Sequence, residues 1–392
     1  MPDQIVILET MPSARDFYEL YWNKKPFVVR GAISQDEISG YITPEELAGL
    51  SMEEVPRSRF IKTAGEHQDW SCGYGPFAEE DFATAGDKDW SLLIQNVEQF
   101  HPETAKLLRH FNFAPRWLLD DIMVSYSEEG GSVGPHLDTY HVFLTQGQGK
   151  RRWKISRTEL KEEICIQGMD FKVLVDGFEG DEIEVSCGDV LYIPPRFGHE
   201  GVTTESALTF SVGILGPKLS ELFSGYGQYL SEFEDMDKRY VAQGLGSDSA
   251  GFSISTSAVD HLRDSLTEQL NAKGFTQWLV EFFTESSHED FGEYSERDDL
   301  LSADALEASL KEGAGLIKPE YVKFAITESS SGRFYLGFDT QSFAIDESLL
   351  SVIQLFMKED MVSVESYPAL LDHPATQEFL LELYNHQALE FT

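Results

Sequence analysis

The sequence predicts a mixed α+β protein whose central part, about residues 120–215, is a β-sandwich or barrel. In that part, short runs rich in β-branched and aromatic residues follow one another closely and are separated by Gly, Pro and Asp. After residue 217 the pattern changes, because apolar residues recur at three- and four-residue intervals, as in KLSELFSGYGQYLSEFED. That change indicates amphipathic helices following the β-rich part.

The first 120 residues mix strand-like and helix-like runs. PFVVRG at 26–31 favours a strand, and DKDWSLLIQNVEQF at 87–100 favours a helix. This segment is therefore expected to be a mixed α/β lead-in. The strands expected after it are IMVSYS, YHVFLTQ, RRWKI, FKVLV, DEIEV, DVLYIPP and ALTFSVGIL.

The last third of the chain predicts a separate unit. Helices are expected over 218–285, and the polar, acidic stretch SSHEDFGEYSERDD at 286–299 suits a linker, so we expect a boundary near 290–300. Beyond it come a helix-like SADALEASLKEG, three strand-like runs, and helices near 347–357 and 375–386. This order is similar to a winged helix. Residues 301–392 carry 5 Lys/Arg against 15 Asp/Glu, so DNA contact is not expected.

Composition narrows the possible partners. At 392 residues the chain exceeds the usual size of one core, and two or three domains are expected. Its 68 acidic against 30 basic side chains give a formal net charge of −38, which repels nucleic acid and attracts basic partners such as a basic protein substrate. The alternative is that the acidity only secures solubility.

Cysteine usage and the absence of targeting signals indicate a cytoplasmic protein. The three cysteines form no CxxC pair, so neither a disulfide framework nor a thiolate zinc site is supported. No stretch reaches the roughly 18 uncharged apolar residues of a membrane helix, and the N-terminal residues lack a basic region followed by an apolar run.

The stretch GGSVGPHLDTYHVFLTQ places His136 and Asp138 two residues apart, just after a Gly-rich turn. Residues i and i+2 of a strand point to one face, so an imidazole and a carboxylate can converge on one ion. Two histidines and one carboxylate make up the facial triad of non-haem Fe(II) oxygenases. A lone H-x-D pair is more often structural, and a third ligand is needed.

The segment CGDVLYIPPRFGHEGV supplies that third ligand as His199, expected on a loop or strand start at the barrel mouth. Three protein ligands would leave three octahedral positions free, two for a 2-oxo acid and one for dioxygen. His141 is not assigned to the metal, because its offsets from His136 and Asp138 leave its side ambiguous.

A 2-oxo acid would also need a cation for its far carboxylate, and KRRW at 150–153 offers one. Strand alternation places Arg151 with Trp153 on one face, and Lys150 with Arg152 on the other. Arginine suits bidentate carboxylate binding. The alternative is that the whole run is solvated surface.

These residues carry a resemblance to a known family. GPHLDTYHVFLTQGQGKRRWKI followed by GDVLYIPPRFGHEG closely resembles the bacterial JmjC-type ribosomal oxygenases. WNKKPFVVRGA, ITPEELAGLSMEE at 42–54 and WSLLIQNVEQF also resemble that family, so the similarity extends through most of the chain.

The resemblance implies a site and a reaction. Iron would lie on His136, Asp138 and His199, and 2-oxoglutarate would be held by Arg151 with help from Ser125. The implied reaction is β-carbon hydroxylation of an arginine in a basic ribosomal protein, L16, with oxidation of 2-oxoglutarate to succinate. For the guanidinium, Glu128 or Glu129 is the candidate partner.

The resemblance also implies an architecture. A double-stranded β-helix (cupin/JmjC) domain at 1–217, with its core at about 120–215, would precede a helical dimerisation region at 218–290 and a winged-helix-like domain at 300–392. The chain would be a homodimer.

Other functions stay open. The same iron site suits histidyl hydroxylation or lysine demethylation, and a non-catalytic cupin-like binding protein would share the fold.

Overall fold

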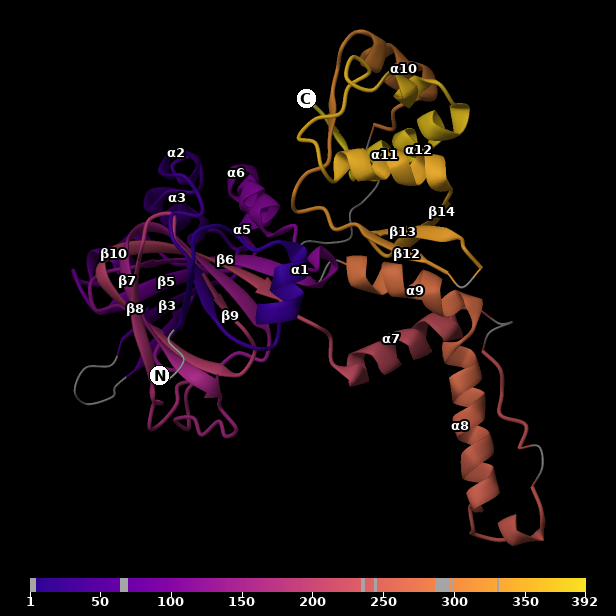
Figure 1. Ribbon diagram of the computed structural model, residues 1–392, viewed down its shortest axis with the longest axis horizontal. Coiled ribbons are helices and arrows are strands. Elements are labelled where there is room, and N and C mark those ends of the chain that lie inside the picture. Colours follow the sequence, from indigo (N-terminus) through magenta and orange to yellow (C-terminus); the bar gives the residue numbers. More distant parts are fainter. Residues whose placement is uncertain are drawn as a thin grey trace. The chain divides into compact units, whose positions relative to one another are not determined.

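The computed structural model describes residues 5–63, 70–233, 237–242, 245–285, 297, 299–329 and 331–392. The chain divides into two compact units, Met1–Gly216 and Pro217–Thr392 (Figure 1). The linker expected at 286–299 lies mostly outside the described residues, and the three-domain division stays a prediction.

The first unit is built on one ten-stranded sheet. Its strands run in the order β1-β2-β9-β7-β10-β6-β5-β3-β4, and β8 pairs with β7. Their bounds are β1 Val6–Leu8, β2 Phe27–Val29, β3 Ser58–Lys62, β4 Ser71–Tyr74, β5 Trp90–Ile94, β6 Leu119–Ser127, β7 His141–Glu159, β8 Gly180–Ser186, β9 Val190–Ile193 and β10 Phe197–Ile214.

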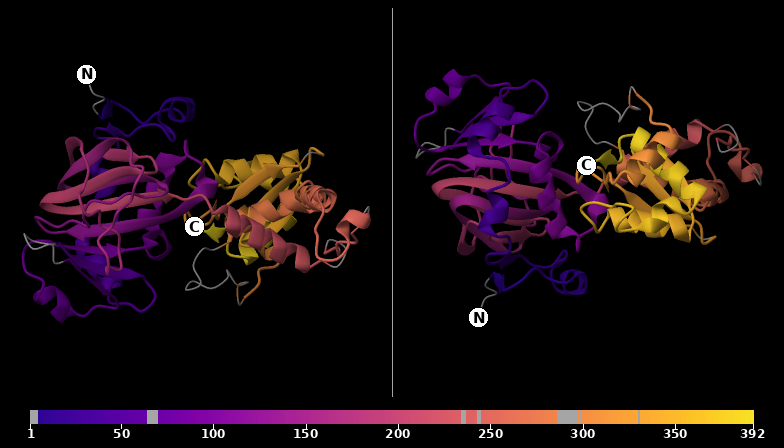
Figure 2. Two further views of the ribbon diagram at one scale, coloured as in Figure 1. Left: turned by 90° about the horizontal axis from the view of Figure 1, so that it is seen from below. Right: turned by 90° about the horizontal axis from the view of Figure 1, so that it is seen from above.

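Two long strands, β7 and β10, turn this sheet into a barrel. Residues 142–145 of β7 pair with β9, whereas residues 150–156 pair with β8. β10 follows β7 along its length and also pairs through residues 207–214 with β6, with register shifts between 203 and 209. Gly149 has φ +65°, which lets β7 bend there. The predicted double-stranded β-helix is therefore confirmed, and its curved strands are visible in Figures 1 and 2.

Short helices cover the outer face of the larger half of the barrel. The main hydrophobic core joins them to outward-facing strand residues such as Val124, Phe143 and Phe210, all fully buried. The alternate residues of the same strands face the barrel interior. The helical segments are α1 Ala14–Asp16, η1 Phe17–Tyr21, α2 Gln35–Ile38, α3 Pro44–Leu50, α4 Glu79–Ala83, α5 Val97–Phe100, α6 Pro102–Ala105, η2 Lys106–Phe111 and η3 Arg116–Leu118.

Three sequence predictions for this unit need correction. The helix expected at 87–100 is wrong, because Trp90–Ile94 is strand β5 between β3 and β6 and only Val97–Phe100 is helical. All five residues of β5 are buried, so the apolar pattern did not alternate. YHVFLTQ and RRWKI form one strand, and FKVLV is a loop that makes one bridge between Cys165 and Leu174.

The second unit begins with α7 Leu219–Ser231, η4 Ser247–Ser249, α8 Thr256–Leu270 and α9 Lys273–Thr284. The predicted order after residue 300 is confirmed by α10 Ala303–Lys311, β12 Ala325–Glu328, β13 Phe334–Phe338, β14 Gln341–Ile345, α11 Glu347–Phe356 and α12 Pro374–Asn385. The structure adds three short elements that were not predicted, β11 Leu316–Ile317, η5 Pro368–Leu371 and β15 Glu390–Phe391. The sheet β12-β13-β14 lies between α9 and the pair α11 and α12 (Figures 1 and 2).

The remaining sequence observations agree with this structure. Cys72, Cys165 and Cys187 are half-buried free thiols. Within the described part of the chain, every helix is too short or too polar to cross a bilayer.

Candidate metal centre and cavity

His136 and His199 are brought side by side by a two-residue β-bridge. Each backbone N–H donates to the other residue's carbonyl oxygen, at 3.0 Å from His136 and 2.8 Å from His199. A directly opposed pair on an antiparallel bridge puts both side chains on one face. The imidazole centroids are consequently 4.2 Å apart. His199 lies near the start of β10, as expected, whereas residues 137–140 form no regular strand.

The backbone also orients the metal-facing nitrogen of each imidazole. Nδ1 of His136 donates to the carbonyl of Gly134 at 2.9 Å, and Nδ1 of His199 donates to the carbonyl of Phe197 at 3.0 Å. These bonds leave both Nε2 lone pairs available, which is the usual arrangement behind a metal-ligating histidine.

Asp138 completes a three-donor cluster. Its carboxylate lies 3.4 Å from Nε2 of His199, and its carbonyl accepts the N–H of Arg196 at 2.7 Å. Donor atoms of His136, Asp138 and His199 all lie within 4.8 Å of one another. Two imidazoles and one carboxylate on one side of an open cavity fit a divalent transition metal with vacant positions.

The protonation states suit metal binding. Burial, followed by the charge of His199, lowers the pKa of His136 to about 4, so its ring is neutral near pH 7. Burial would raise the pKa of Asp138, but its hydrogen bond with His199 and the two nearby imidazoles outweigh that effect and lower it. The cluster therefore presents a neutral imidazole at His136 and an anion at Asp138.

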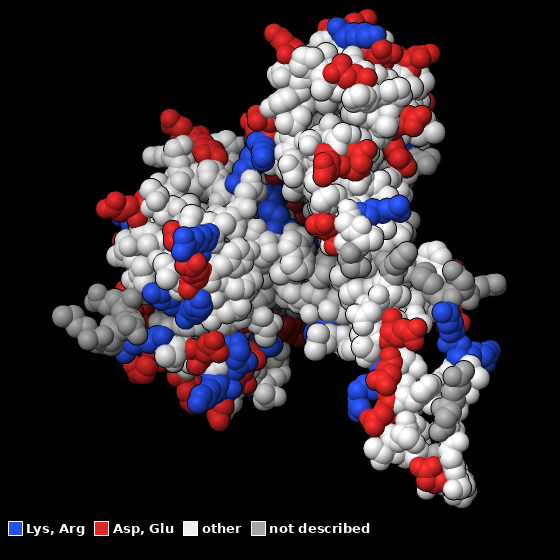
Figure 3. Space-filling model, turned by 45° about the vertical axis from the view of Figure 1, so that its right-hand side comes forward, with Lys and Arg blue, Asp and Glu red and all other residues white. Residues whose placement is uncertain are grey.

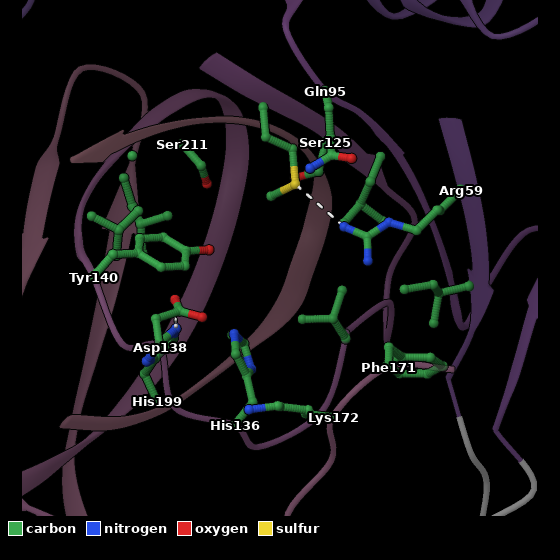
Figure 4. Close-up of a pocket in the computed structure, with 18 of the residues that line it drawn as sticks. Arg59, Gln95, Ser125, His136, Asp138, Tyr140, Phe171, Lys172, His199 and Ser211 are labelled. Atoms are coloured by element: carbon green, nitrogen blue, oxygen red, sulfur yellow. Dashed lines mark hydrogen bonds and ion pairs between the residues drawn. The ribbon is translucent and has the colours of Figure 1, made fainter. Parts of the chain in front are cut away.

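The cluster lies at one side of a cavity of about 350 Å³ inside the barrel (Figure 4). Strands β3, β5, β6, β7 and β10 all contribute inward-facing residues. Asp138, His136 and His199 lie together in Figure 4, and Tyr140 and Arg59 lie on opposite sides of the space above them.

Arg151 also lines this cavity and is 4% exposed. The predicted alternation is confirmed, because Trp153 is buried with it while Lys150 and Arg152 are exposed. Its guanidinium donates to Thr209 Oγ1 at 3.4 Å and Ser127 Oγ at 3.3 Å, and its Nε has no partner among the described residues. Burial lowers the pKa of Arg151 to about 10, so it remains charged at neutral pH.

Ser125 faces the same space from β6. Ser125 pairs with Thr209 of the neighbouring strand β10, and Thr209 accepts a hydrogen bond from Arg151. Ser125 therefore lies next to a residue that Arg151 contacts. It is 5% exposed and lines the cavity. The structure therefore brings all five predicted site residues to one cavity.

The sequence analysis missed the acidic side of this cavity. Glu128 bonds to the hydroxyls of Tyr126 and Ser206, and Glu129 pairs with Lys88, so neither candidate is in the cavity lining. The lining instead includes Asp120 and Asp121 at the start of β6, together with Tyr140 and Ser211. In the sequence, the sign of these two carboxylates was the pair DD at the start of the β-rich part. Such a pair by itself cannot be distinguished from a solvated turn.

His141, left unassigned from the sequence, belongs to the core. Its ring stacks on Trp22 with centroids 3.5 Å apart, and its Nδ1 lies 2.7 Å from the Tyr192 hydroxyl. Burial lowers its pKa to about 4. It is therefore no part of the metal cluster.

Comparison with known proteins agrees with this arrangement. Residues 106–222 match the model of the JmjC domain, and residues 264–390 match that of the ROXA-like winged helix. Together with the barrel and its cluster, these matches define a JmjC-type 2-oxoglutarate-dependent oxygenase.

Similarity to individual proteins narrows this class. The chain is 37% identical over 282 residues to the ribosomal protein uL16 3-hydroxylase of Escherichia coli (strain K12), covering 70% of this chain and 72% of the relative. It is 42% identical over 214 residues to a protein of Haemophilus influenzae named a probable ribosomal oxygenase, covering 53% and 51%. The chain belongs to the ribosomal oxygenase family.

Solved structures give the same result. The X-ray structure of E. coli ycfD matches with a TM-score of 0.82 at 30% identity, covering 96% of this chain and 98% of that one. The structure of YcfD in complex with cobalt and 2-oxoglutarate matches with a TM-score of 0.79 at 31% identity, covering 96% and 97%. The predicted combination of folds is confirmed over nearly the whole chain.

Proposed function

We propose that the protein is an Fe(II)- and 2-oxoglutarate-dependent hydroxylase of a ribosomal protein, with iron on His136, Asp138 and His199. The observation that carries this proposal is that the three-donor cluster opens onto the same cavity as buried Arg151, whose hydrogen-bond partners among the described residues are neutral hydroxyls. Bound iron would supply the activation of dioxygen that couples oxidation of 2-oxoglutarate to hydroxylation of a C–H bond.

The protein's own residues position the co-substrate. Arg151 binds the far carboxylate of 2-oxoglutarate through its guanidinium, and Ser125 assists from the neighbouring strand. That carboxylate supplies a counter-charge to Arg151, whose partners in the described part of the chain are uncharged hydroxyls. The apolar and aromatic lining around it, including Leu144 and Trp153, reduces access of water to the ion pair.

The target we propose is the β-carbon of an arginine in ribosomal protein uL16 (L16). The E. coli relative is named a 3-hydroxylase of ribosomal protein uL16. The carboxylates of Asp120 and Asp121 in the cavity lining complement a guanidinium, and the net charge of −38 complements a basic ribosomal protein. Acidic side chains are spread over the face shown in Figure 3, with basic ones scattered among them.

Mass spectrometry tests the target. Ribosomal proteins from cells lacking this chain should lose the mass of one oxygen atom from a uL16 arginine, and the purified enzyme should restore it with Fe(II) and 2-oxoglutarate. His136→Ala should fail to restore it, while the exposed His373→Ala should succeed. Loss from a histidine, or a gain of lysine methylation, would instead support the histidyl hydroxylase or the lysine demethylase.

Spectroscopy distinguishes the proposed oxygenase from a non-catalytic cupin-like binding protein. Anaerobic addition of Fe(II) and 2-oxoglutarate should give a visible charge-transfer band that His136→Ala abolishes. A wild-type protein without that band would contradict the oxygenase.

We further propose that the chain is a cytoplasmic homodimer without direct DNA binding, in which 218–290 is the dimerisation region between the catalytic domain at 1–217 and the winged helix at 300–392. Monomers rarely leave so many large apolar side chains exposed in one region. The exposed ones from the start of α7 to the end of α8 include Leu219, Phe223, Val241, Phe252, Ile254 and Leu266. Light scattering should give twice 44.2 kDa, and a mass of one chain would contradict the dimer.

A further inference from the structure

Arg59 places a second guanidinium in the cavity, on the far side of Ser125 from Arg151. It lies on β3 opposite Leu93 of β5, and Leu93 lies opposite Ser125 of β6. Adjacent strands are about 4.8 Å apart, so the backbones of Arg59 and Ser125 are separated by roughly 10 Å. Ile61, two residues along, also lines the cavity, whereas Phe60 between them packs into the core on the other face.

Most N–H donors of the Arg59 guanidinium have no acceptor among the described residues. Its hydrogen bond within the described residues is to the sulfur of Met123, at 3.9 Å, and it forms no ion pair with a described carboxylate. A thioether is a weak acceptor. The side-chain amide of Gln95, from the end of β5, lines the cavity beside it, and both point into the space in Figure 4.

The wall opposite carries charge of the other sign. Tyr140 lies across the cavity from Arg59 in Figure 4. Asp120 and Asp121 lie beside Tyr140, because all three side chains come within 4 Å of a Cβ built on Gly213, and Asp170 and Lys172 also line the cavity. A cationic target side chain is attracted to those carboxylates and repelled by Arg59. Every residue of a peptide offers a neutral main-chain carbonyl oxygen, and such an acceptor suits the N–H donors of Arg59.

We propose that Arg59 is a substrate-positioning residue, which donates hydrogen bonds to a main-chain carbonyl of the protein substrate while the target side chain enters the acidic side of the cavity. Gln95 extends the same contact, because an amide can both donate to and accept from a peptide bond. This inference rests on the proposed function and adds how the substrate backbone is positioned.

A binding experiment tests Arg59 separately from catalysis. The affinity of a fluorescent uL16 peptide spanning the target arginine is measured anaerobically with the Fe(II) and 2-oxoglutarate form of the enzyme. Arg59→Met, which keeps the stem and removes the donors, should weaken the Kd about tenfold or more, as expected for a hydrogen bond from a charged donor. Lys62→Met, on the same strand but exposed, is the matched control and should bind as wild type.

A thioamide scan of the peptide identifies the acceptor. Replacing one carbonyl oxygen at a time by sulfur weakens that acceptor. At one position the substitution should weaken binding to wild type but have no further effect on Arg59→Met. Equal thioamide effects in both proteins at every position, or an unchanged or tighter Kd for Arg59→Met, would overturn the proposal.

If the proposed hydroxylase activity is wrong, these experiments give a result that differs from failure of the Arg59 proposal alone. If the peptide binds and is not hydroxylated in air, the proposed activity is wrong while the role of Arg59 is still decided by the Kd values. If the peptide does not bind wild type at all, both proposals fail. The charge-transfer band of Arg59→Met shows that its co-substrate site is folded.

Discussion

At the scale of single residues, the most informative side chain is the buried cation Arg151. A buried cation is costly unless an anion compensates it. Arg151 is 4% exposed and its described hydrogen-bond partners are the neutral hydroxyls of Thr209 and Ser127. A ligand carboxylate is the simplest compensation, and this is why the cavity favours a dianionic co-substrate.

Replacing Arg151 by Gln should raise the KM for 2-oxoglutarate about a hundredfold, because a charge-assisted, bidentate contact is lost. Arg152→Gln is the matched control, since its side chain is exposed on the opposite face of the same strand. Initial rates of succinate formation at varied 2-oxoglutarate check both. Equal KM values in the two variants would contradict the role of Arg151.

At the scale of elements, one buried histidine joins three segments of the first unit. His141, at the start of β7, contacts Trp22, just after η1, and Tyr192 of β9. Its ring is 6% exposed, and burial lowers its pKa to about 4. A proton therefore binds the unfolded chain more readily than the folded one.

This linkage predicts an acid-sensitive stability. Above the unfolded pKa of about 6.5 the ring is neutral in both states; as pH falls toward 4 the unfolded state gains a proton first, and stability falls by up to about 3 kcal/mol. His141→Phe keeps a ring against Trp22 but cannot titrate, so its free energy of unfolding should fall less over that range. Denaturant titrations of metal-free protein at several pH values test this, and parallel curves would contradict it.

The bend of β7 is a second feature at this scale. Gly149 has φ +65°, and an added Cβ would lie 2.0 Å from the carbonyl oxygen of Ser206 on β10. The bend therefore needs both a left-handed backbone and space that only glycine leaves.

Gly149→Ala should destabilise the protein by more than about 2 kcal/mol, through backbone strain and a clash with backbone atoms. Gly177→Ala separates these effects, because Gly177 has φ +61° with nothing within 4 Å of the added Cβ. That control should lose only about 1 kcal/mol. Denaturant midpoints measure both, and equal losses would show that the close approach of β10 is unimportant.

At the scale of the whole molecule, the net charge is the feature that most affects how a substrate approaches the protein. A net charge of −38 produces a long-range field that attracts a basic substrate before any specific contact forms. The field is screened over about 10 Å at 0.1 M salt. Recognition should therefore depend on ionic strength more than co-substrate binding does.

We expect kcat/KM for full-length uL16 to fall about tenfold or more between low and high salt. The KM for 2-oxoglutarate should change little, because Arg151 is buried and less screened. Steady-state rates from about 20 to 500 mM NaCl measure both quantities. A kcat/KM for uL16 independent of salt would show that the acidity serves solubility alone.

The sequence by itself determined which residues are candidates for the metal and co-substrate site, and the order of helices and strands in the second unit. The spacing of His136 and Asp138 and the Pro-bounded run before His199 are local patterns that identified the candidate ligands. Strand geometry converts the alternation around Arg151 directly into a shared face, whereas His136 and Asp138 lie outside a regular strand and His136 is placed by its bridge to His199. The elements after residue 300 were predictable for the same reason, because each shows its own periodicity and turn signals.

Only the tertiary structure decided what surrounds these residues. The run at 90–94 is a strand because it is buried between β3 and β6, and burial on both faces removes the alternation that would have identified it. The acidic pair at 120–121 and Arg59 reach the cavity through pairings between strands far apart in the chain. Such partners are chosen by how the whole barrel packs, so no local pattern can specify them.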